Sequence, residues 1–295
     1  MTGPIETFVG GFAFLECPRW HDGKLWMVDM HRDLVVAVSE DGSTEEFTVP
    51  GRPGGMGWFK DGSLAVVAMH NRKVMKYSNG ELSTYCDMTD IGATQHELND
   101  LVMDAHDRCY VGEFGVDVYA WMAENMPKAQ EHGVKILGEI PIKEADVFVI
   151  ENGRASVAAS GLRFPNGAAV SVDQTRYVVA ETFGLRLSEY KLADGVLTDR
   201  RIIDLGFAPD GISRMDEEGG IWISDPLGSK VHRIDAAGAI TEIVECDLPA
   251  YACEIGGPDG RTLFICLGSS FDPNLTVKTR DARIATVRVD VPAPR

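Results

Sequence analysis

Four side chains in the sequence carry oxygen atoms of the kind that bind a hard divalent cation. Glu16 and Asp210 are carboxylates that would balance the charge of such an ion, and Asn99 and Asn166 are amides that would add carbonyl oxygens. This donor set favours Ca²⁺, with Mg²⁺ or Mn²⁺ as the next candidates. None of the four positions holds His or Cys, so Zn²⁺ is less favoured and copper is disfavoured. We therefore predict a metal site, provided that the fold brings these residues together.

A repeat of about forty residues predicts how the four residues meet. Six segments share a turn followed by a short strand rich in β-branched and aromatic residues. They align without gaps and are Asp22–Asp29, Asp61–Ala68, His106–Glu113, Gln174–Glu181, Glu218–Asp225 and Gly260–Leu267. A period of this length, filled with strands and turns, is typical of the blades of a β-propeller.

Each repeat also has room for further strands. The segments Val35–Ser39 and Thr44–Val49 would complete one blade, and Ile5–Val9 would close the last blade beside Arg283–Val289. Because a single small sheet cannot bury both of its faces, the blades must stack against one another. We predict an all-β fold, a six-bladed β-propeller of four-stranded blades, that forms one domain over residues 1–295.

The position within the repeat links the four candidate ligands. In a propeller the first strand of each blade lines the central channel, and here that strand precedes the turn. Counting back 13 to 15 residues from four of the six strand ends, Asp29, Glu113, Glu181 and Asp225, reaches the four candidates. We expect Ile212–Met215 to be the strand that follows Asp210. The other two repeats supply small or apolar residues that would leave room for a ligand: Gly54, Gly55 and Met56 in one, Ala252 and Cys253 in the other.

A purely structural interpretation of the same residues is also available. Pro-Asn-Gly and Pro-Asp-Gly are ordinary turn sequences, Asn99 would suit a turn, and Glu16 would suit an exposed strand end. Two observations favour the metal site. The four residues share one position in a repeat that was found without them, and Glu16 interrupts the apolar run Phe12–Leu15, where an uncompensated buried carboxylate is costly.

Composition excludes several classes of partner. A net charge of -17 argues against a nucleic acid or an anionic membrane, although an acidic solvated surface explains most of that charge without any cation. The six cysteines show no Cys-x-x-Cys spacing, so we expect free buried thiols. No signal peptide and no long apolar run is present, which predicts a cytoplasmic protein. No feature of the sequence indicates an oligomeric state.

Four short motifs resemble those of the gluconolactonase and luciferin-regenerating-enzyme family, which includes regucalcin and the senescence marker proteins. The resemblance extends over essentially the whole chain, and its motifs are Leu15–Trp20, Leu98–Asp100, Phe164–Gly167 and Pro209–Gly211. It implies a six-bladed propeller with a metal, usually calcium, held by the residues that match Glu16, Asn166 and Asp210. It also implies that Asn99 lies beside metal and substrate, that Asp210 is the catalytic base, and that the reaction is lactone hydrolysis.

One departure from the family bears on the substrate. Sugar-lactone members commonly carry an Arg two residues before the matching Asn, whereas this chain has Glu97. Asp117 falls where those members have an acidic substrate contact. We expect a small lactone or ester as the substrate, in contact with Asn99, Glu97, Asp117 and Met56, and Glu97 argues against a sugar lactone.

An insertion at residues 116–145 lengthens one repeat. It follows the second strand of its blade, so it would emerge above the metal and serve as a lid. Val118, Trp121 and Met122 form a short helical apolar stripe, which packs on its own scaffold more often than on a ligand. By the same reasoning His31, His70 and Phe183 would rim the site, although solvated loop positions are the more common environment for the two histidines.

The predicted mechanism is metal-assisted opening of a lactone ring. The cation would polarise the carbonyl while a water attacks, and Asp210 would accept the proton of that water or, less favoured, attack directly. Two alternatives stay open. The same oxygen site could hydrolyse organophosphates or other esters, as diisopropyl-fluorophosphatase does, or the protein could bind calcium without catalysis.

Overall fold

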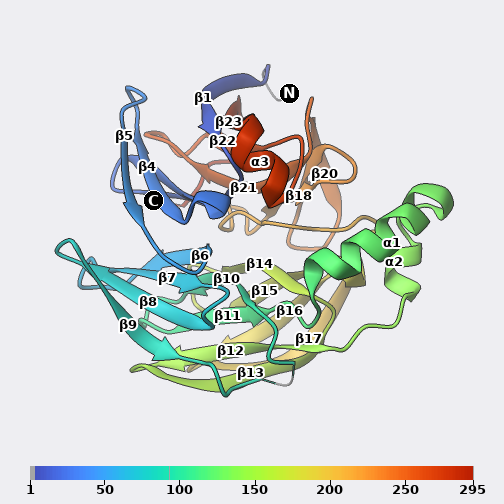
Figure 1. Cartoon of the computed structure of the whole chain (residues 1–295), viewed down its shortest axis with the longest axis horizontal. Helices are drawn as coiled ribbons and strands as arrows, with labels where there is room; N and C mark the ends of the chain where they lie inside the picture. The colour runs from blue at the N-terminus through green and yellow to red at the C-terminus, as the bar shows by residue number, and fades with distance from the viewer. Residues whose placement is uncertain (1–3, 93, 295) are drawn as a thin grey trace. The chain divides into compact units, whose positions relative to one another are not determined.

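The computed structural model describes residues 4–92 and 94–294, and its architecture is dominated by short antiparallel strands (Figure 1). In the described residues the strands form six sheets that follow one another along the chain. Five sheets have four strands and one has three. The fold is a six-bladed β-propeller, as the repeat predicts.

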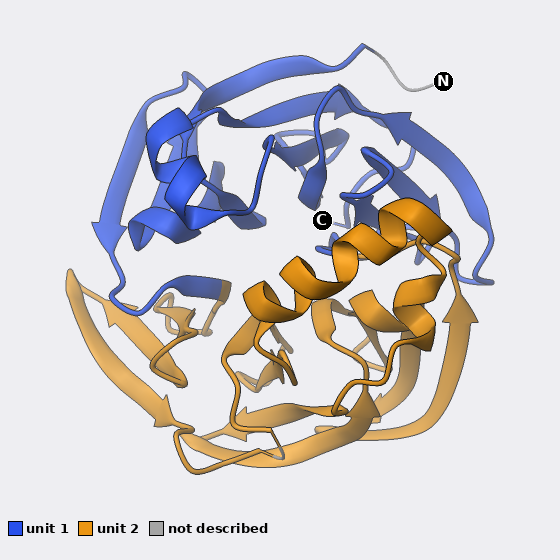
Figure 2. Ribbon diagram, turned by 45° about the vertical axis from the view of Figure 1, so that its right-hand side comes forward, with its two compact units in different colours: residues 1–54, 210–295 blue, residues 55–209 orange. Residues whose placement is uncertain are grey.

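Two compact units divide the strands, and Figure 2 distinguishes them by colour. Unit 1 comprises residues up to Gly54 and from Asp210 onward. Its sheets are β2 (Leu15–His21), β3 (Lys24–Asp29), β4 (Leu34–Ser39) and β5 (Thr44–Thr48); β18 (Ile221–Asp225), β19 (Lys230–Ile234) and β20 (Ile240–Glu245); and β21 (Ala250–Gly256), β22 (Thr262–Leu267), β23 (Ala282–Arg288) and β1 (Glu6–Phe12). It also contains the 3₁₀ turn η1 (Met30–Arg32) and the helix α3 (Pro273–Thr279).

Unit 2 comprises residues Gly55–Pro209, and the boundary with unit 1 falls within β6. Its sheets are β6 (Pro53–Trp58), β7 (Leu64–Ala68), β8 (Lys73–Ser78) and β9 (Glu81–Asp87); β10 (Leu98–Met103), β11 (Cys109–Glu113), β12 (Ala145–Glu151) and β13 (Arg154–Leu162); and β14 (Pro165–Val170), β15 (Arg176–Glu181), β16 (Arg186–Ala193) and β17 (Val196–Asp204). The helices α1 (Val118–His132) and α2 (Ile136–Glu139) and the 3₁₀ turn η2 (Thr182–Gly184) complete it.

The six repeated strands are confirmed to the residue at their ends. β3, β7, β11, β15, β18 and β22 end at Asp29, Ala68, Glu113, Glu181, Asp225 and Leu267, as the repeat predicts. Both faces of these second strands are largely buried, which explains why they appear as near-continuous apolar runs. The predicted closure is also confirmed, because β1 pairs antiparallel with β23.

The first strand of the fifth sheet is the exception. The strand predicted for Ile212–Met215 is reduced to a single bridge between Ile212 and Ile223. The amide of Trp222 donates to the hydroxyl of Ser213 at 3.0 Å, while the amide of Ser213 donates to the carbonyl of Trp222 at 2.9 Å. A side-chain hydroxyl thus takes one place in the ladder, and regular pairing stops.

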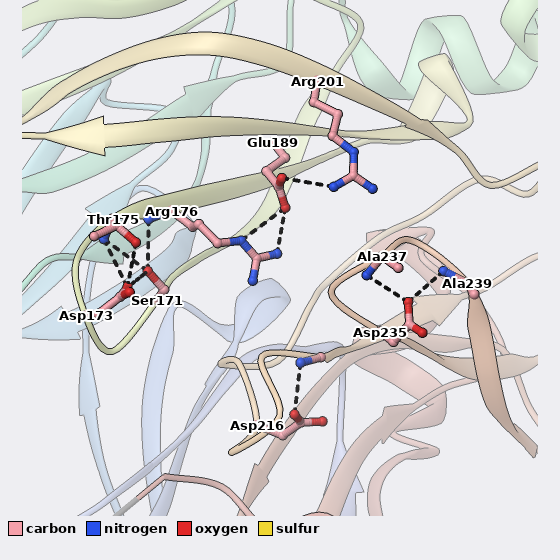
Figure 3. A network of polar contacts seen from close by, with 11 residues as sticks. Ser171, Asp173, Thr175, Arg176, Glu189, Arg201, Asp216, Asp235, Ala237 and Ala239 are labelled. Atoms are coloured by element: carbon pink, nitrogen blue, oxygen red, sulfur yellow. Dashed lines mark hydrogen bonds and ion pairs between the residues drawn. The ribbon is translucent and has the colours of Figure 1, made fainter.

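Aspartates close many of the turns between strands. In unit 2, Asp173 accepts hydrogen bonds from Ser171 and from both the amide and the hydroxyl of Thr175 (Figure 3). In unit 1, Asp235 accepts from the amides of Ala237 and Ala239 at 2.9 Å (Figure 3). These bonds hold the pKa of both carboxyl groups below the ordinary value. Part of the acidic composition is therefore turn chemistry.

Candidate metal centre

Three of the four predicted ligands occupy one position in the ladders of their sheets, and Asp210 lies outside a strand. Glu16, Asn99 and Asn166 are each the second residue of the first strand of a sheet. The residue before each of them pairs with the acidic end of the second strand, in the pairs Leu15↔Asp29, Leu98↔Glu113 and Pro165↔Glu181. The strand register thus shows the shared position for these three residues.

A register shift follows at the same place in each of these sheets. The ladder slips between Glu16 and Arg19, between Leu98 and Leu101, and between Pro165 and Ala168. Asn99 and Asn166 therefore lie in bulges, outside regular pairing. A bulge bends the strand and redirects side chains, and bulges are frequent beside active sites.

Buried acids at the ends of the second strands hold the backbone that leads to these positions. Asp29 accepts hydrogen bonds from the amides of Ala13 and Phe14 at 3.0–3.2 Å, directly before Glu16. Glu181 accepts from the amide of Arg163 at 2.8 Å, shortly before Asn166. Asp29 and Glu181 are both fully buried. These acids position the candidate ligands rather than bind a ligand themselves.

In unit 2, Asn99 and Asn166 donate through their amide nitrogens. Asn99 Nδ2 donates to the carbonyl of Pro165 at 3.1 Å, and Asn166 Nδ2 donates to Thr182 Oγ1 at 3.0 Å. Thr182 Oγ1 donates in turn to the carbonyl of Pro209 at 2.8 Å. Because an amide that donates through nitrogen keeps its oxygen as the acceptor, both side chains can still offer Oδ1 to a cation.

In unit 1, Glu16 and Asp210 both lie near the phenol of Tyr251. Glu16 is 8% exposed, and the amide of Asp210 donates to the carbonyl of Ser224 at 3.0 Å. Burial, and then the charges of Asp210, Glu16 and Asp281, raise the pKa of Tyr251 well above its ordinary value. Two carboxylates beside one buried phenol favour a compensating cation, and hard oxygens suit Ca²⁺.

Among residues 4–92 and 94–294, no group of three or more His, Cys, Asp or Glu side chains is arranged to hold a metal ion. The predicted set contains only two acids, with amides as the other donors. The residue types in each unit therefore fit a hard cation, and the complete four-residue set stays a prediction.

Glu97, Asp117 and Met56, which we expect to contact the substrate, lie in unit 2 and each has different neighbours. Glu97 Oε1 lies 3.2 Å from Nε2 of His70, and the second carboxylate oxygen of Glu97 is buried. Asp117 caps α1 by accepting from the amide of Ala120 at 3.0 Å. Met56 is fully buried in β6. The cap accounts for Asp117 in structural terms, and its contact with substrate stays a prediction.

Gly55 does not provide open space for a ligand. A Cβ atom at this position would lie 1.7 Å from the backbone nitrogen of Leu101. The close approach of β6 to β10 therefore requires glycine here, which explains the small residue by packing and not by room for a ligand.

The insertion packs on its own unit. The ring of Trp121 in α1 stacks on Phe183 with centroids 3.8 Å apart, and Phe183 is almost fully buried. Arg163 donates to the carbonyls of Leu137, Ile140 and Phe183, which fixes α2 and η2 to the start of β14. The contact of Trp121 with Phe183 agrees with packing of the apolar stripe on its own scaffold. Closure of the insertion over a substrate stays a prediction.

His31 differs from the solvated loop residue that its position suggests. Its ring stacks on Phe14 with centroids 4.7 Å apart, and Nδ1 lies 2.7 Å from Thr276 Oγ1 in α3. Burial, with a smaller contribution from Arg52, lowers the pKa of His31 to about 4. The helix α3, which the repeat did not predict, provides this environment.

Residues 14–269 match the family model described as the SMP-30/gluconolactonase/LRE-like region. The chain belongs to this family. The match includes all four candidate ligands, and it confirms the resemblance carried by the four short motifs. No curated protein sequence is significantly similar to this family member.

Solved structures of other proteins share the fold at low identity. A luciferin-regenerating enzyme is 17% identical with a TM-score of 0.77, covering 99% of this chain and 97% of that one. The calcium-binding protein regucalcin from Agrobacterium tumefaciens is 15% identical with a TM-score of 0.74, covering 97% and 96%. A gluconolactonase from Xanthomonas campestris is 18% identical with a TM-score of 0.71, covering 98% and 89%.

None of the helices in the described ranges is both long and apolar enough to cross a membrane.

Proposed function

We propose that this family member is a divalent-cation-dependent hydrolase that opens lactone rings. The observation that carries the proposal is the family match over residues 14–269, with Glu16, Asn99, Asn166 and Asp210 at the motif positions. The nearness of Glu16 and Asp210 to one buried phenol in unit 1 supports a cation there. Gluconolactonase and calcium-binding relatives of the same fold agree with this chemistry.

Glu16, Asn99, Asn166 and Asp210 would hold the cation, with Ca²⁺ preferred over Mg²⁺, Mn²⁺ and Zn²⁺. When bound, the cation would supply a Lewis acid for the lactone carbonyl. The carboxylates would balance its charge, and the two amides would contribute neutral oxygens.

Asp210 is the proposed base. Water adds through its oxygen to the carbonyl carbon, and Asp210 takes one of the protons of that water. The bond between the carbonyl carbon and the ring oxygen then breaks, and the ring oxygen receives the proton. The product is a hydroxy acid, and the reaction consumes one water with no redox partner.

The first experiment tests Asp210 as both base and cation ligand by substitution. We expect Asp210→Ala to abolish lactone hydrolysis and to weaken calcium binding measured by titration calorimetry. Glu16→Gln should weaken calcium binding and reduce the rate. Glu40→Gln removes an exposed carboxylate and serves as the matched control with unchanged values. An Asp210→Ala protein that keeps full activity and calcium affinity would exclude the assignment.

Chelation tests the cation and the alternative functions together. We expect chelated wild type to lose hydrolysis of lactones and to regain it with one divalent ion, calcium first. Hydrolysis of a fluorophosphate without any lactone would instead favour the organophosphatase alternative. A rise in melting temperature with calcium, but no turnover of lactones, esters or fluorophosphates, would favour a calcium-binding protein.

A further inference from the structure

Tyr251 occupies in β21 the same ladder position that the candidate ligands occupy elsewhere. Ala250 pairs with Leu267, the end of the second strand, and the register then shifts before Ala252 pairs with Cys266. Tyr251 therefore lies in the bulge, as Asn99 and Asn166 do in their own sheets. The bulge redirects this side chain as it redirects theirs.

Contacts within unit 1 fix Tyr251 from two sides. The carbonyl of Tyr251 accepts a hydrogen bond from the amide of Gly211 at 2.9 Å, which ties it to the residue after Asp210. A Cβ on Gly211 would lie 2.6 Å from Cβ of Ala252, so only glycine permits this approach. The ring of Tyr251 packs edge-on against Phe14 with centroids 4.8 Å apart and is 7% exposed.

The surroundings hold the phenol beside the two candidate acids. Phe14 is itself stacked on His31, so the apolar side of the Tyr251 ring is firmly packed. Asp210 and Glu16 lie close enough to the phenol to interact with it electrostatically. An ordinary tyrosine phenol carries its proton at neutral pH, so the hydroxyl is a hydrogen-bond donor in a well-packed side chain.

We propose that Tyr251 is a further catalytic residue of this site, whose hydroxyl donates a hydrogen bond to the ring oxygen of the lactone as that oxygen leaves. The proposal rests on the lactonase function proposed above. The ring oxygen gains negative charge as its bond to the carbonyl carbon breaks, so the hydrogen bond strengthens in the transition state. Tyr251 keeps its proton throughout, and the proton that completes the alcohol is the one that Asp210 took from water.

The test compares Tyr251→Phe with the wild type on two kinds of lactone. γ-Butyrolactone releases an alkoxide, whereas dihydrocoumarin releases a more stable phenolate that gains less from a donor. We expect the substitution to lower kcat for γ-butyrolactone about a hundredfold, as loss of one donor to a developing anion does in other enzymes. The loss for dihydrocoumarin should be much smaller, and KM should change little for both.

Two further measurements separate this role from a structural one. Calcium affinity by titration calorimetry and the melting temperature should match those of the wild type, because phenylalanine keeps the ring contact with Phe14. Tyr190→Phe is the matched control, since Tyr190 is also buried in a sheet and lies in the third strand of that sheet, away from the ladder position of the candidate ligands. Its kinetics should equal those of the wild type.

Each outcome has a definite meaning. An active wild type with unchanged Tyr251→Phe kinetics, or with equal losses on both lactones, would overturn the proposal and leave the lactonase function standing. Loss of activity together with calcium affinity would assign Tyr251 to the support of the cation and would also overturn it. A wild type that opens no lactone would refute the proposed function, and the role of Tyr251 with it.

Discussion

Removing the charge of Glu181 tests the idea that strand-end acids hold the candidate site in place. Glu181 is fully buried and bonds to Arg186 at 2.8 Å and to Arg200 at 2.6 Å, as well as to the amide of Arg163. Glu181→Gln keeps the shape but turns an acceptor for two guanidinium groups into an amide that also donates. Both arginines then lose the carboxylate that they bond to directly.

The expected cost follows from the exposure of the partners. Breaking a fully buried ion pair typically costs about 3–5 kcal/mol. The side chains of Arg186 and Arg200 are 24% and 27% exposed, so water compensates in part. We expect the free energy of unfolding to fall by about 2–4 kcal/mol, a drop in melting temperature of roughly 4–8 °C for a chain of this size.

The lowered pKa of Glu181 determines how the stability difference between wild type and variant changes with pH. Burial alone would raise the pKa of Glu181, but hydrogen bonds from Arg186, Ser188 and the amide of Arg163 outweigh it and leave the pKa lowered. A lowered folded-state pKa means that the carboxylate stabilises the fold above the ordinary pKa, and that this stability is lost as the pH falls through the folded-state value. The difference between wild type and variant should therefore be largest at neutral pH and shrink below about pH 4.

The assay is thermal and urea unfolding of both proteins at several pH values. Asp199→Asn is the control, because Asp199 and its partner Lys191 are 64% and 76% exposed, and we expect it to change stability by less than about 0.5 kcal/mol. A Glu181→Gln variant within the range of that control, or a deficit that stays constant down to pH 3, would refute the reasoning.

Two further predictions concern the surroundings of the site. Arg163→Met should leave the carbonyls of Leu137, Ile140 and Phe183 without this donor and lower the free energy of unfolding by about 1–3 kcal/mol. Thermolysin should then cleave faster within residues 116–145. An unchanged rate of cleavage there would contradict the role of Arg163. The pKa of His31 is lowered to about 4, mainly by burial and then by Arg52, against a smaller opposing effect of Asp272. The unfolded chain therefore binds this proton first, and stability should fall between about pH 6.5 and pH 4. His31→Phe should flatten that slope in urea unfolding, and an equal slope would show that other groups cause it.

The second strands could be predicted from the sequence because they are buried on both faces. Runs such as Ile221–Asp225, between Gly-rich turns, leave few alternatives, and all six ends agree with the structure. The four candidate ligands could be predicted in part for the same reason, since their place in the ladder follows from the strand ends. Their convergence on one cation remains a proposal.

Other features depend on local geometry that has no periodic pattern in the sequence. Counting back to Ala252 and Cys253 missed Tyr251 because the length of the bulge sets which residue leaves the ladder. The bridge at Ile212 depends on one hydroxyl that takes a ladder position. The environment of His31 depends on α3, a short helix that follows the last repeated strand.

The pairing of β1 with β23 has a consequence for synthesis on the ribosome. Glu6 lies opposite Thr286, so β1 must remain unpaired until the residues of β23 have been translated. The three sheets of unit 2 are contiguous in the chain and can assemble meanwhile. An unpaired strand edge can associate with other nascent chains, and Glu6, Gly10 and Gly11 make β1 a poor template for aggregation.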